Sequence, residues 1–313
     1  MSETYLVTGG AGFIGSHIVE ALVEAGETVR VIDNFATGRP ENLAPFRDRI
    51  TFYELDITDR AALDEAFDGV DYVLHQAAIP SVPRSVDDPL GTHDANVTGT
   101  LNVLDAARKA GVRRVVYAAS SSAYGEIAGE YKREDMNPSP LSPYAAAKLA
   151  GEHYCQAFFH VYGLETVALR YFNVFGPRQD PTSQYAAVIP LFVTAMLDGR
   201  PPTVYGDGLQ SRDFTYVANV VRGNLLACKA PAAAAGQVIN MACGDSISLL
   251  DLIAEINAIL GTDIAPVHTA PRPGDIKHSK ADITRARELL GYEPQVSFRE
   301  GLARTVAFFR ALS

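Results

Sequence analysis

The side chains that could do chemistry are a tyrosine and a lysine, Tyr144 and Lys148, together with Ser120 two dozen residues upstream. Residues four apart lie on one face of a helix, so a helix here would place the phenol beside the ammonium. A nearby positive charge favours the phenolate and moves a phenol pKa of about 10 toward the range of a general base. The spacing predicts a proton-transfer pair, although any surface helix can contain it by chance.

The residues before this pair carry the signals of a helix start. Ser142 is a good N-cap, and Pro143 suits the first helical turn, where its missing N–H is not needed. We therefore expect one helix from Tyr144 to about Tyr162.

A glycine pattern near the start of the chain lies between a short apolar strand and a helical pattern. Gly9, Gly12 and Gly15 allow a tight turn, a close approach of backbone N–H groups to a pyrophosphate, and close packing of helix on strand. A second apolar strand ends at Asp33, about twenty residues on, where a carboxylate accepts hydrogen bonds from an adenosine ribose and repels a 2′-phosphate. The pattern predicts an NAD(H) site; the alternative is a glycine-rich turn with a solvated aspartate.

Apolar strands and helical patterns alternate through the first 120 residues. Such alternation predicts right-handed crossovers and a parallel sheet that binds ligands at the carboxyl ends of its strands. Ser120 would lie at such an end, although it could equally belong to a polar loop with Ser121 and Ser122. The expected strands cover residues 5–8, 29–33, 50–55, 72–75 and 113–119, and the expected helices 16–25, 60–67 and 92–110.

The composition bounds the class of protein. At 313 residues the chain suits about two domain-sized units, and 47% hydrophobic residues are enough to form their cores. No run approaches the roughly 18 apolar residues of a membrane helix, and the first residues do not form a secretory leader, so we expect a cytoplasmic protein. The 27 basic and 37 acidic residues give a net charge of −10, which argues against nucleic-acid or membrane binding.

Neither the cysteines nor the histidines have the spacing of metal ligands. Cys155, Cys228 and Cys243 fit core residues in a reducing compartment, and the seven histidines are scattered along the chain. We expect no metal site.

Together, the glycine pattern, Asp33, Ser120, Tyr144 and Lys148 resemble the extended short-chain dehydrogenase/reductase family, and specifically its UDP-sugar 4-epimerases. The similarity runs from about residue 3 to 310. Further matching segments cover residues 75–78, 170–178, 206–208, 211–214 and 272–275. The resemblance implies an α/β enzyme with a Rossmann-type doubly wound parallel sheet and a smaller, non-contiguous α/β substrate-binding domain.

The resemblance also implies which residues bind the ligands, with Ser120, Tyr144 and Lys148 as the catalytic set. NAD would contact Gly9, Gly12, Phe13, Ile14, Gly15, Asp33, Asn34, Asp56, Ile57, Ala77, Ala78, Asn96, Tyr144, Lys148 and Tyr171. The UDP-sugar would contact Ser81, Ser120, Ser122, Asn173, Val188, Arg212, Arg272, Asp275 and Ser279.

Two arginines can hold a diphosphate through several charge-assisted hydrogen bonds. The alternatives are a surface ion pair of Arg212 with Asp213 and a solvated loop residue for Arg272.

The implied reaction uses these groups in turn. Tyr144 as phenolate takes the proton of a sugar 4-hydroxyl while C4 gives hydride to the nicotinamide, and Ser120 is hydrogen-bonded to the reacting oxygen. Lys148 orients the nicotinamide ribose and, with the charge of NAD⁺, keeps the tyrosine pKa low. Similar dehydratases and decarboxylases carry an acid directly after the serine position or two residues on. Because Ser121 and Ser122 stand there, epimerisation with permanently bound NAD is expected.

The sugar itself is harder to assign. Residues 78–85, 179–181 with 185–190, and 274–282 most resemble epimerases of N-acetylated UDP-hexosamines, and Ser279 stands where glucose-only relatives have a bulky tyrosine facing sugar C2. UDP-N-acetylglucosamine is therefore the expected substrate, with UDP-glucose as a side activity, unless Ser279 only makes the pocket permissive. UDP-glucuronate or UDP-glucose alone remain alternatives, and Arg84 could indicate a carboxylate. A non-catalytic NAD-binding regulator or a net reductase would lie outside this class.

The resemblance further implies how the chain is divided and assembled. The NAD-binding domain would contain residues 1–176 plus about 214–240, with the strand and helix of 214–227 returning to the sheet. The UDP-sugar-binding domain would contain about 177–213 plus 241–313, with amphipathic helices over 249–260, 283–290 and 299–309. A homodimer is expected through the helices of 92–110 and 144–162.

Overall fold

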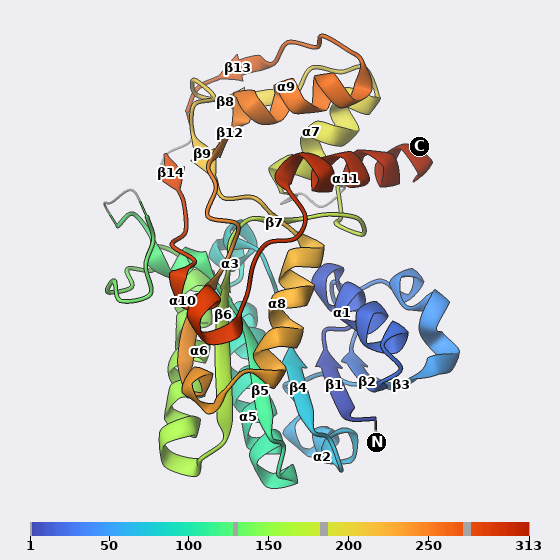
Figure 1. Cartoon of the computed structure of the whole chain (residues 1–313), viewed down its shortest axis with the longest axis vertical. Helices are drawn as coiled ribbons and strands as arrows, with labels where there is room; N and C mark the ends of the chain where they lie inside the picture. Colours follow the sequence, from blue (N-terminus) through green and yellow to red (C-terminus); the bar gives the residue numbers. More distant parts are fainter. Residues whose placement is uncertain (1, 128–130, 182–186, 272–276, 313) are drawn as a thin grey trace.

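The computed structural model describes residues 2–127, 131–181, 187–271 and 277–312. Within these ranges, seven strands form a central parallel sheet in the order β11-β6-β5-β4-β1-β2-β3 (Figure 1). Its strands are β1 (Thr4–Thr8), β2 (Thr28–Asp33), β3 (Ile50–Glu54), β4 (Tyr72–His75), β5 (Arg114–Ser120), β6 (Glu165–Tyr171) and β11 (Gln237–Met241). The prediction of a Rossmann-type doubly wound parallel sheet is confirmed.

Helices cover both faces of this sheet (Figure 1). Successive side chains of a strand point to opposite faces, and β5 illustrates the result. Val115 and Tyr117 pack in a cluster with α5 (Gly99–Ala110) and α6 (Pro143–Tyr162). Val116 and Ala118 belong to the cluster that contains α1 (Phe13–Glu24) and α8 (Val217–Lys229). Because both faces are buried, these strands read as continuous apolar runs rather than as alternating ones.

The expected helix over 92–110 is interrupted. The chain forms α4 (Pro89–His93), then a π-helical segment at Asp94–Thr98, and then α5. The π turn widens the helix at Asn96, whose side chain bonds the backbone of Ile79 instead of pointing to solvent.

A second group of elements lies beyond the carboxyl ends of the strands (Figure 1). It includes three small sheets, ordered β10-β7, β12-β9-β14 and β13-β8. Their strands are β7 (Val174–Phe175), β8 (Thr203–Tyr205), β9 (Ser211–Arg212), β10 (Thr215–Tyr216), β12 (Ile247–Ser248), β13 (Val267–Thr269) and β14 (His278–Ser279).

The strand predicted within 214–227 does not return to the central sheet. That strand, β10, pairs with β7, and the chain rejoins the sheet only at β11, beside β6. Strand β10 has two residues, whereas β11 has five, four of them buried.

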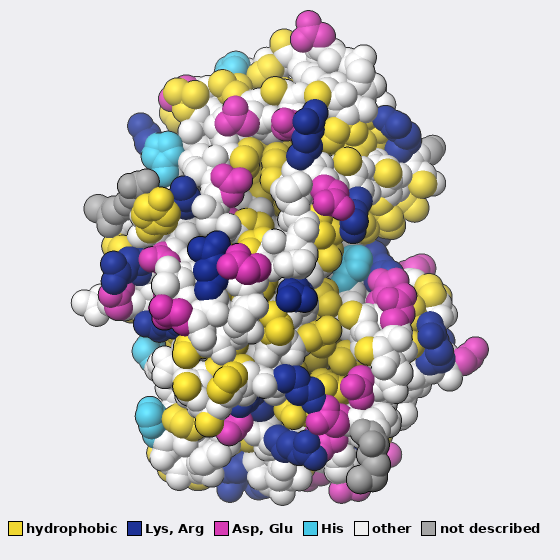
Figure 2. Space-filling view, in the orientation of Figure 1, with side chains coloured by type: hydrophobic (Ala, Val, Ile, Leu, Met, Phe, Trp, Pro, Cys, Tyr) yellow, Lys and Arg dark blue, Asp and Glu magenta, His cyan; other side chains and the backbone are white. Residues whose placement is uncertain are grey.

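Where expectations were made, the remaining helices match them within three residues at each end, except that the helix expected over 60–67 begins as a 3₁₀ segment, Arg60–Leu63, and becomes α-helical at Asp64. They are α2 (Asp64–Phe67), α3 (Val82–Asp87), α7 (Val188–Leu197), α9 (Leu249–Leu260), α10 (Thr284–Leu290) and α11 (Phe298–Leu312). On the face drawn in Figure 2, acidic and basic side chains are interspersed. Within the described residues, no helix is long and apolar enough to cross a membrane.

Candidate active site

The glycine turn after β1 forms a backbone cradle. Gly9 has φ +69°, in the left-handed region, and its N–H donates to the carbonyl of Ile32 over 2.7 Å. A Cβ at Gly9 would lie 2.6 Å from the backbone nitrogen of Ala77. Helix α1 begins at Phe13, and no described side chain caps its start at Gly12. The free N–H groups of this helix start face a turn without side chains, which fits a pyrophosphate.

Asp33 at the end of β2 ties this turn to the strand. Its carboxylate accepts from the N–H of Ala11 over 2.9 Å and of Phe35 over 2.7 Å. Burial raises the pKa of this carboxyl, and the bond from Phe35 opposes the shift. Each carboxylate oxygen keeps a further lone pair, which can accept from a ribose hydroxyl.

The next two predicted cofactor residues meet at the adjoining strand end. Asn34 donates from Nδ2 to Oδ2 of Asp56 over 2.8 Å. Burial alone would raise the pKa of Asp56, but the hydrogen bonds from Thr58 and Asn34 lower it, so the carboxylate is fixed as an anion.

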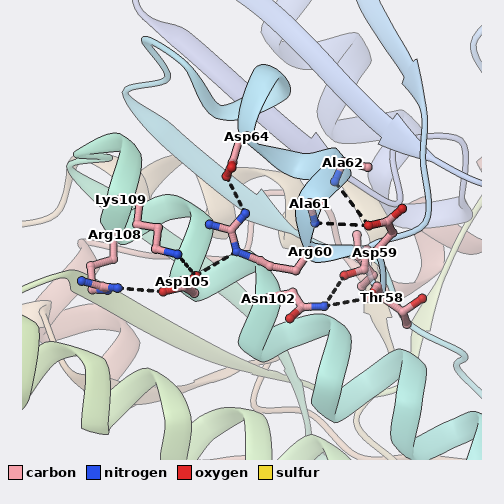
Figure 3. A network of polar contacts seen from close by, with 11 residues as sticks. Thr58, Asp59, Arg60, Ala61, Ala62, Asp64, Asn102, Asp105, Arg108 and Lys109 are labelled. Atoms are coloured by element: carbon pink, nitrogen blue, oxygen red, sulfur yellow. Dashed lines mark hydrogen bonds and ion pairs between the residues drawn. The ribbon is translucent and has the colours of Figure 1, made fainter.

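A polar network between α5 and residues 57–60 holds the loop after β3 in place (Figure 3). Asn102 of α5 donates to the carbonyls of Ile57 and Thr58 over 3.0 and 2.9 Å. Arg60 bonds Asp105 of the same helix over 2.8 Å. The position of Asp56 and Ile57 is thus set by α5.

The loop after β4 carries the predicted residues Ala77 and Ala78. Asn96 accepts from the N–H of Ile79 over 2.8 Å and donates to its carbonyl over 3.2 Å. Just before the loop, His75 is held between the hydroxyls of Thr8 at 2.7 Å and Thr100 at 3.0 Å. The loop is therefore fixed from both sides, close to the glycine turn.

The structure brings two predicted catalytic residues together. Ser120 ends β5, and its Oγ accepts from the N–H and the hydroxyl of Ser122 over 3.2 and 2.8 Å. Tyr144 lies in the first turn of α6, which is capped by Ser142 as predicted. Burial raises the pKa of Tyr144, and a hydrogen bond with Ser120 lowers it.

Lys148 is buried, and its ammonium donates to the carbonyl of Ala118 over 2.9 Å. Burial lowers its pKa to about 8. The ammonium points to the strand beneath, and the predicted lowering of the Tyr144 pKa by Lys148 together with NAD⁺ stays a prediction.

A buried network below the loop holds the predicted cofactor residue Tyr171 and includes Asn224, which the sequence did not indicate. Tyr171, which pairs in register with Ser120, donates to Gln76 over 3.1 Å, and Asn224 of α8 donates to its hydroxyl over 2.8 Å. Gln76 belongs to a recognised segment, but Asn224 lies in a helix with no local signal of its own.

The predicted substrate residues form a second group. Arg212 of β9 pairs in register with Ser279 of β14, so these two residues are neighbours. Asn173 has φ +35° and donates to the carbonyl of Asp213 over 3.3 Å. Asp213 is fully buried, which excludes the surface ion pair with Arg212 that the sequence left open.

Two other predicted substrate residues lie at the starts of helices. Ser81 caps α3 by accepting from the N–H of Arg84, and Val188 begins α7. Arg272 and Asp275 lie outside the described residues.

Comparisons with known proteins agree with this geometry. The sequence model of the NAD dependent epimerase/dehydratase family matches residues 5–242. The UDP-glucose 4-epimerase of Mycolicibacterium smegmatis is 42% identical over 310 residues, which cover 97% of this chain and 98% of that protein.

Solved structures are similar over the whole chain. The UDP-N-acetylglucosamine 4-epimerase of Methanobrevibacter ruminantium, in complex with UDP-N-acetylmuramic acid, is 42% identical, with 100% of both chains covered and a TM-score of 0.95. The UDP-glucose 4-epimerase of Thermus thermophilus, in complex with NAD, is 38% identical, with 99% of this chain and 100% of that chain covered and a TM-score of 0.89. The chain therefore belongs to the NAD dependent epimerase/dehydratase family, as an enzyme whose cofactor is NAD.

Proposed function

We propose that this enzyme interconverts UDP-N-acetylglucosamine and UDP-N-acetylgalactosamine, and also accepts UDP-glucose and UDP-galactose. The observation that carries the choice of sugar is the pairing of Ser279 with Arg212 across β14 and β9. A small side chain beside a diphosphate anchor leaves volume for an acetamido group at sugar C2. The similarity to a UDP-N-acetylglucosamine 4-epimerase along the entire chain supports the same choice.

When bound, NAD supplies reversible oxidation at sugar C4. Tyr144 takes the proton of the 4-hydroxyl as C4 is oxidised and returns it to the same oxygen after the sugar has turned. Ser120, already hydrogen-bonded to Tyr144, contacts the reacting oxygen. Arg212 and Asn173, with Arg272, hold the UDP end firmly, so that the sugar can present its other face.

Lys148 has the donors needed for its proposed role. An ammonium has three donors, and one of them is used by the carbonyl of Ala118. The others can bond a nicotinamide ribose without loss of the existing bond. We propose that the charge of Lys148, together with the positive charge of NAD⁺, lowers the pKa of Tyr144 and favours the phenolate.

We also propose the two-part division of the chain. Residues 1–176 plus about 214–240 would bind NAD, and about 177–213 plus 241–313 would bind the UDP-sugar. In support, β11 joins the central sheet whereas β12, β13 and β14 pair outside it.

We propose a homodimer that forms through α5 and α6. An open groove of about 510 Å³ runs between these helices and is lined by Leu101 and Phe158 among others. Val161 and Tyr162 at its end are 70% and 54% exposed. A second copy of the same two helices would cover this apolar surface.

The test is to incubate the purified protein, without added NAD, with UDP-N-acetylglucosamine, UDP-glucose and UDP-glucuronate in turn. We expect 4-epimers from the first two and the higher kcat/KM for the first. No 4-epimer from any of them would refute the epimerase function, and a product from UDP-glucuronate alone would refute the proposed sugar.

Variants at Ser279 test the volume argument directly. Ser279→Tyr should lower kcat/KM for UDP-N-acetylglucosamine at least tenfold relative to UDP-glucose. Ser279→Ala keeps the volume and should leave the ratio within about twofold. Full N-acetyl activity in Ser279→Tyr would remove the argument.

A further inference from the structure

Asp213 lies where three proposed substrate-binding segments meet. It directly follows Arg212 and is fully buried. Its N–H donates to the carbonyl of Ser279 over 2.8 Å, and its own carbonyl accepts from Nδ2 of Asn173 over 3.3 Å. The main chain of one residue thus links Asn173 to the strand that holds Ser279.

The carboxylate of Asp213 connects two further places. Oδ1 accepts from the N–H of Cys243 over 3.0 Å, and Oδ2 accepts from the N–H groups of Gly244 over 2.9 Å and Ala281 over 3.2 Å. Cys243 and Gly244 follow β11 of the central sheet, and Ala281 follows β14. Burial raises the pKa of Asp213 to about 6, and the three backbone hydrogen bonds act against the rise. A buried carboxylate is costly unless it is hydrogen-bonded, so these bonds fix the side chain in place.

The segment that Asp213 holds is also fixed on its other side. The N–H of Lys132 donates to the carbonyl of Lys280 over 2.7 Å, and the N–H of Asp282 donates to the carbonyl of Lys132 over 3.0 Å. Lys132 belongs to the loop between Ser120 and Tyr144. Residues 279–282 therefore lie between the loop that joins the catalytic residues and the strand of the diphosphate anchor.

We propose that Asp213 is a positioning residue of the substrate site, whose carboxylate holds the paired strands of Arg212 and Ser279 against the segment that follows β11. It acts through these residues and through Asn173, without touching the substrate. The proposal rests on the proposed function, because it takes Arg212, Asn173 and Ser279 to contact a UDP-sugar. Without the carboxylate, β9 and β14 would stay paired, but Arg212 and Ser279 would no longer be fixed relative to Cys243 and Gly244 at the end of the central sheet.

Asp213→Asn tests this role. An amide has one oxygen, and its NH₂ group would face a backbone N–H instead of accepting from it. We expect KM for UDP-N-acetylglucosamine to rise at least tenfold, kcat at saturation to change less than threefold, and bound NAD to remain as in the wild type. Bound NAD also reports that the variant is folded.

Asp71→Asn is the matched control for a purely structural effect. Asp71 also accepts from a backbone N–H, that of Thr4 over 2.9 Å, and pairs with Arg113 over 2.9 Å. It precedes β4 at the opposite end of the sheet. Both variants should lower Tm, but only Asp213→Asn should raise KM. An equal KM in both would overturn the proposal.

Two further measurements keep the test decisive. If Asp213→Asn does not retain NAD, Asp213→Glu keeps the charge but displaces the bonded segments, and the same rise in KM is expected; an unchanged KM would overturn the proposal.

If the wild type has no epimerase activity, titration calorimetry with UDP replaces the measurement of KM. A Kd at least tenfold weaker in Asp213→Asn supports the positioning role, and an equal Kd contradicts it, whatever the reaction.

Discussion

At Tyr144, burial and a hydrogen bond act on the phenol in opposite directions, and burial prevails in the chain alone. The spacing of Tyr144 and Lys148 correctly predicts the helix that carries both. It does not predict where the ammonium points, because the carbonyl of Ala118 that accepts from it lies on β5, outside the local pattern. The residue types could thus be found from sequence, whereas their protonation depends on partners brought by the fold.

Tyr144→Phe removes the proton-transfer group and keeps the ring. We expect kcat to fall at least a hundredfold, in line with the usual contribution of general acid–base catalysis. Bound NAD and the Kd for UDP should stay within about threefold of the wild type. Tyr154→Phe on the same helix is the control and should keep kcat within about twofold. Substantial kcat in Tyr144→Phe would show that another group transfers the proton.

His75 gives the fold a pH dependence with a defined sign. Burial, and then the charge of Lys148, lower its pKa to about 3, against about 6.5 in an unfolded chain. Between these values only the unfolded chain takes up the proton, so this contribution to stability is complete above pH 6.5 and declines as pH falls toward 3. The raised pKa of Asp213 acts in the opposite direction between about 4 and 6.

The variant His75→Asn lacks this pH-dependent contribution to stability. It should also be less stable at pH 7, because the hydrogen bonds to Thr8 and Thr100 are lost. The difference in free energy of unfolding between wild type and variant should shrink by about 2 kcal/mol from pH 7 to pH 5. Urea unfolding at both pH values measures it. An equal pH slope in wild type and His75→Asn would contradict the prediction.

Among the elements, the glycine turn is readable from sequence because a left-handed turn between strand and helix needs residues without a Cβ. The π turn at Asp94–Thr98 is not, since the bonds of Asn96 to Ile79 that accompany it join residues distant in the sequence. Which of β10 and β11 joins the central sheet is equally hard to predict from the sequence. No strand was expected over Gln237–Met241, and it is the pairing with β6 that brings these residues into the sheet.

The variant Gly9→Ala tests whether the glycine turn after β1 binds the pyrophosphate of NAD. The variant places a Cβ 2.6 Å from the nitrogen of Ala77 and strains a backbone at φ +69°. We expect the purified protein to lose most of its bound NAD, measured by absorbance after denaturation. Gly69→Ala is the matched control, because Gly69 has φ +68° with nothing within 4 Å of its Cβ. It should share the backbone strain but retain NAD; a similar NAD loss in both variants would assign the effect to strain alone.

On the scale of the whole molecule, the proposed dimer depends on the groove between α5 and α6. Val161→Glu places a charge in apolar surface that is 70% exposed in the single chain and should convert a dimer into a monomer. Light scattering measures the mass. Leu312→Glu, at the same exposure on α11, should leave the dimer intact. A monomeric wild type would contradict the proposal.

In the proposed reaction, the hydride taken from sugar C4 would return to the same carbon without exchange. UDP-N-acetylglucosamine carrying deuterium at C4 tests it, with product analysis by NMR and mass spectrometry in ordinary water with excess unlabelled NADH. We expect UDP-N-acetylgalactosamine that keeps its deuterium at C4. Product that has lost the deuterium to water or to the added cofactor, or no 4-epimer at all, would contradict it.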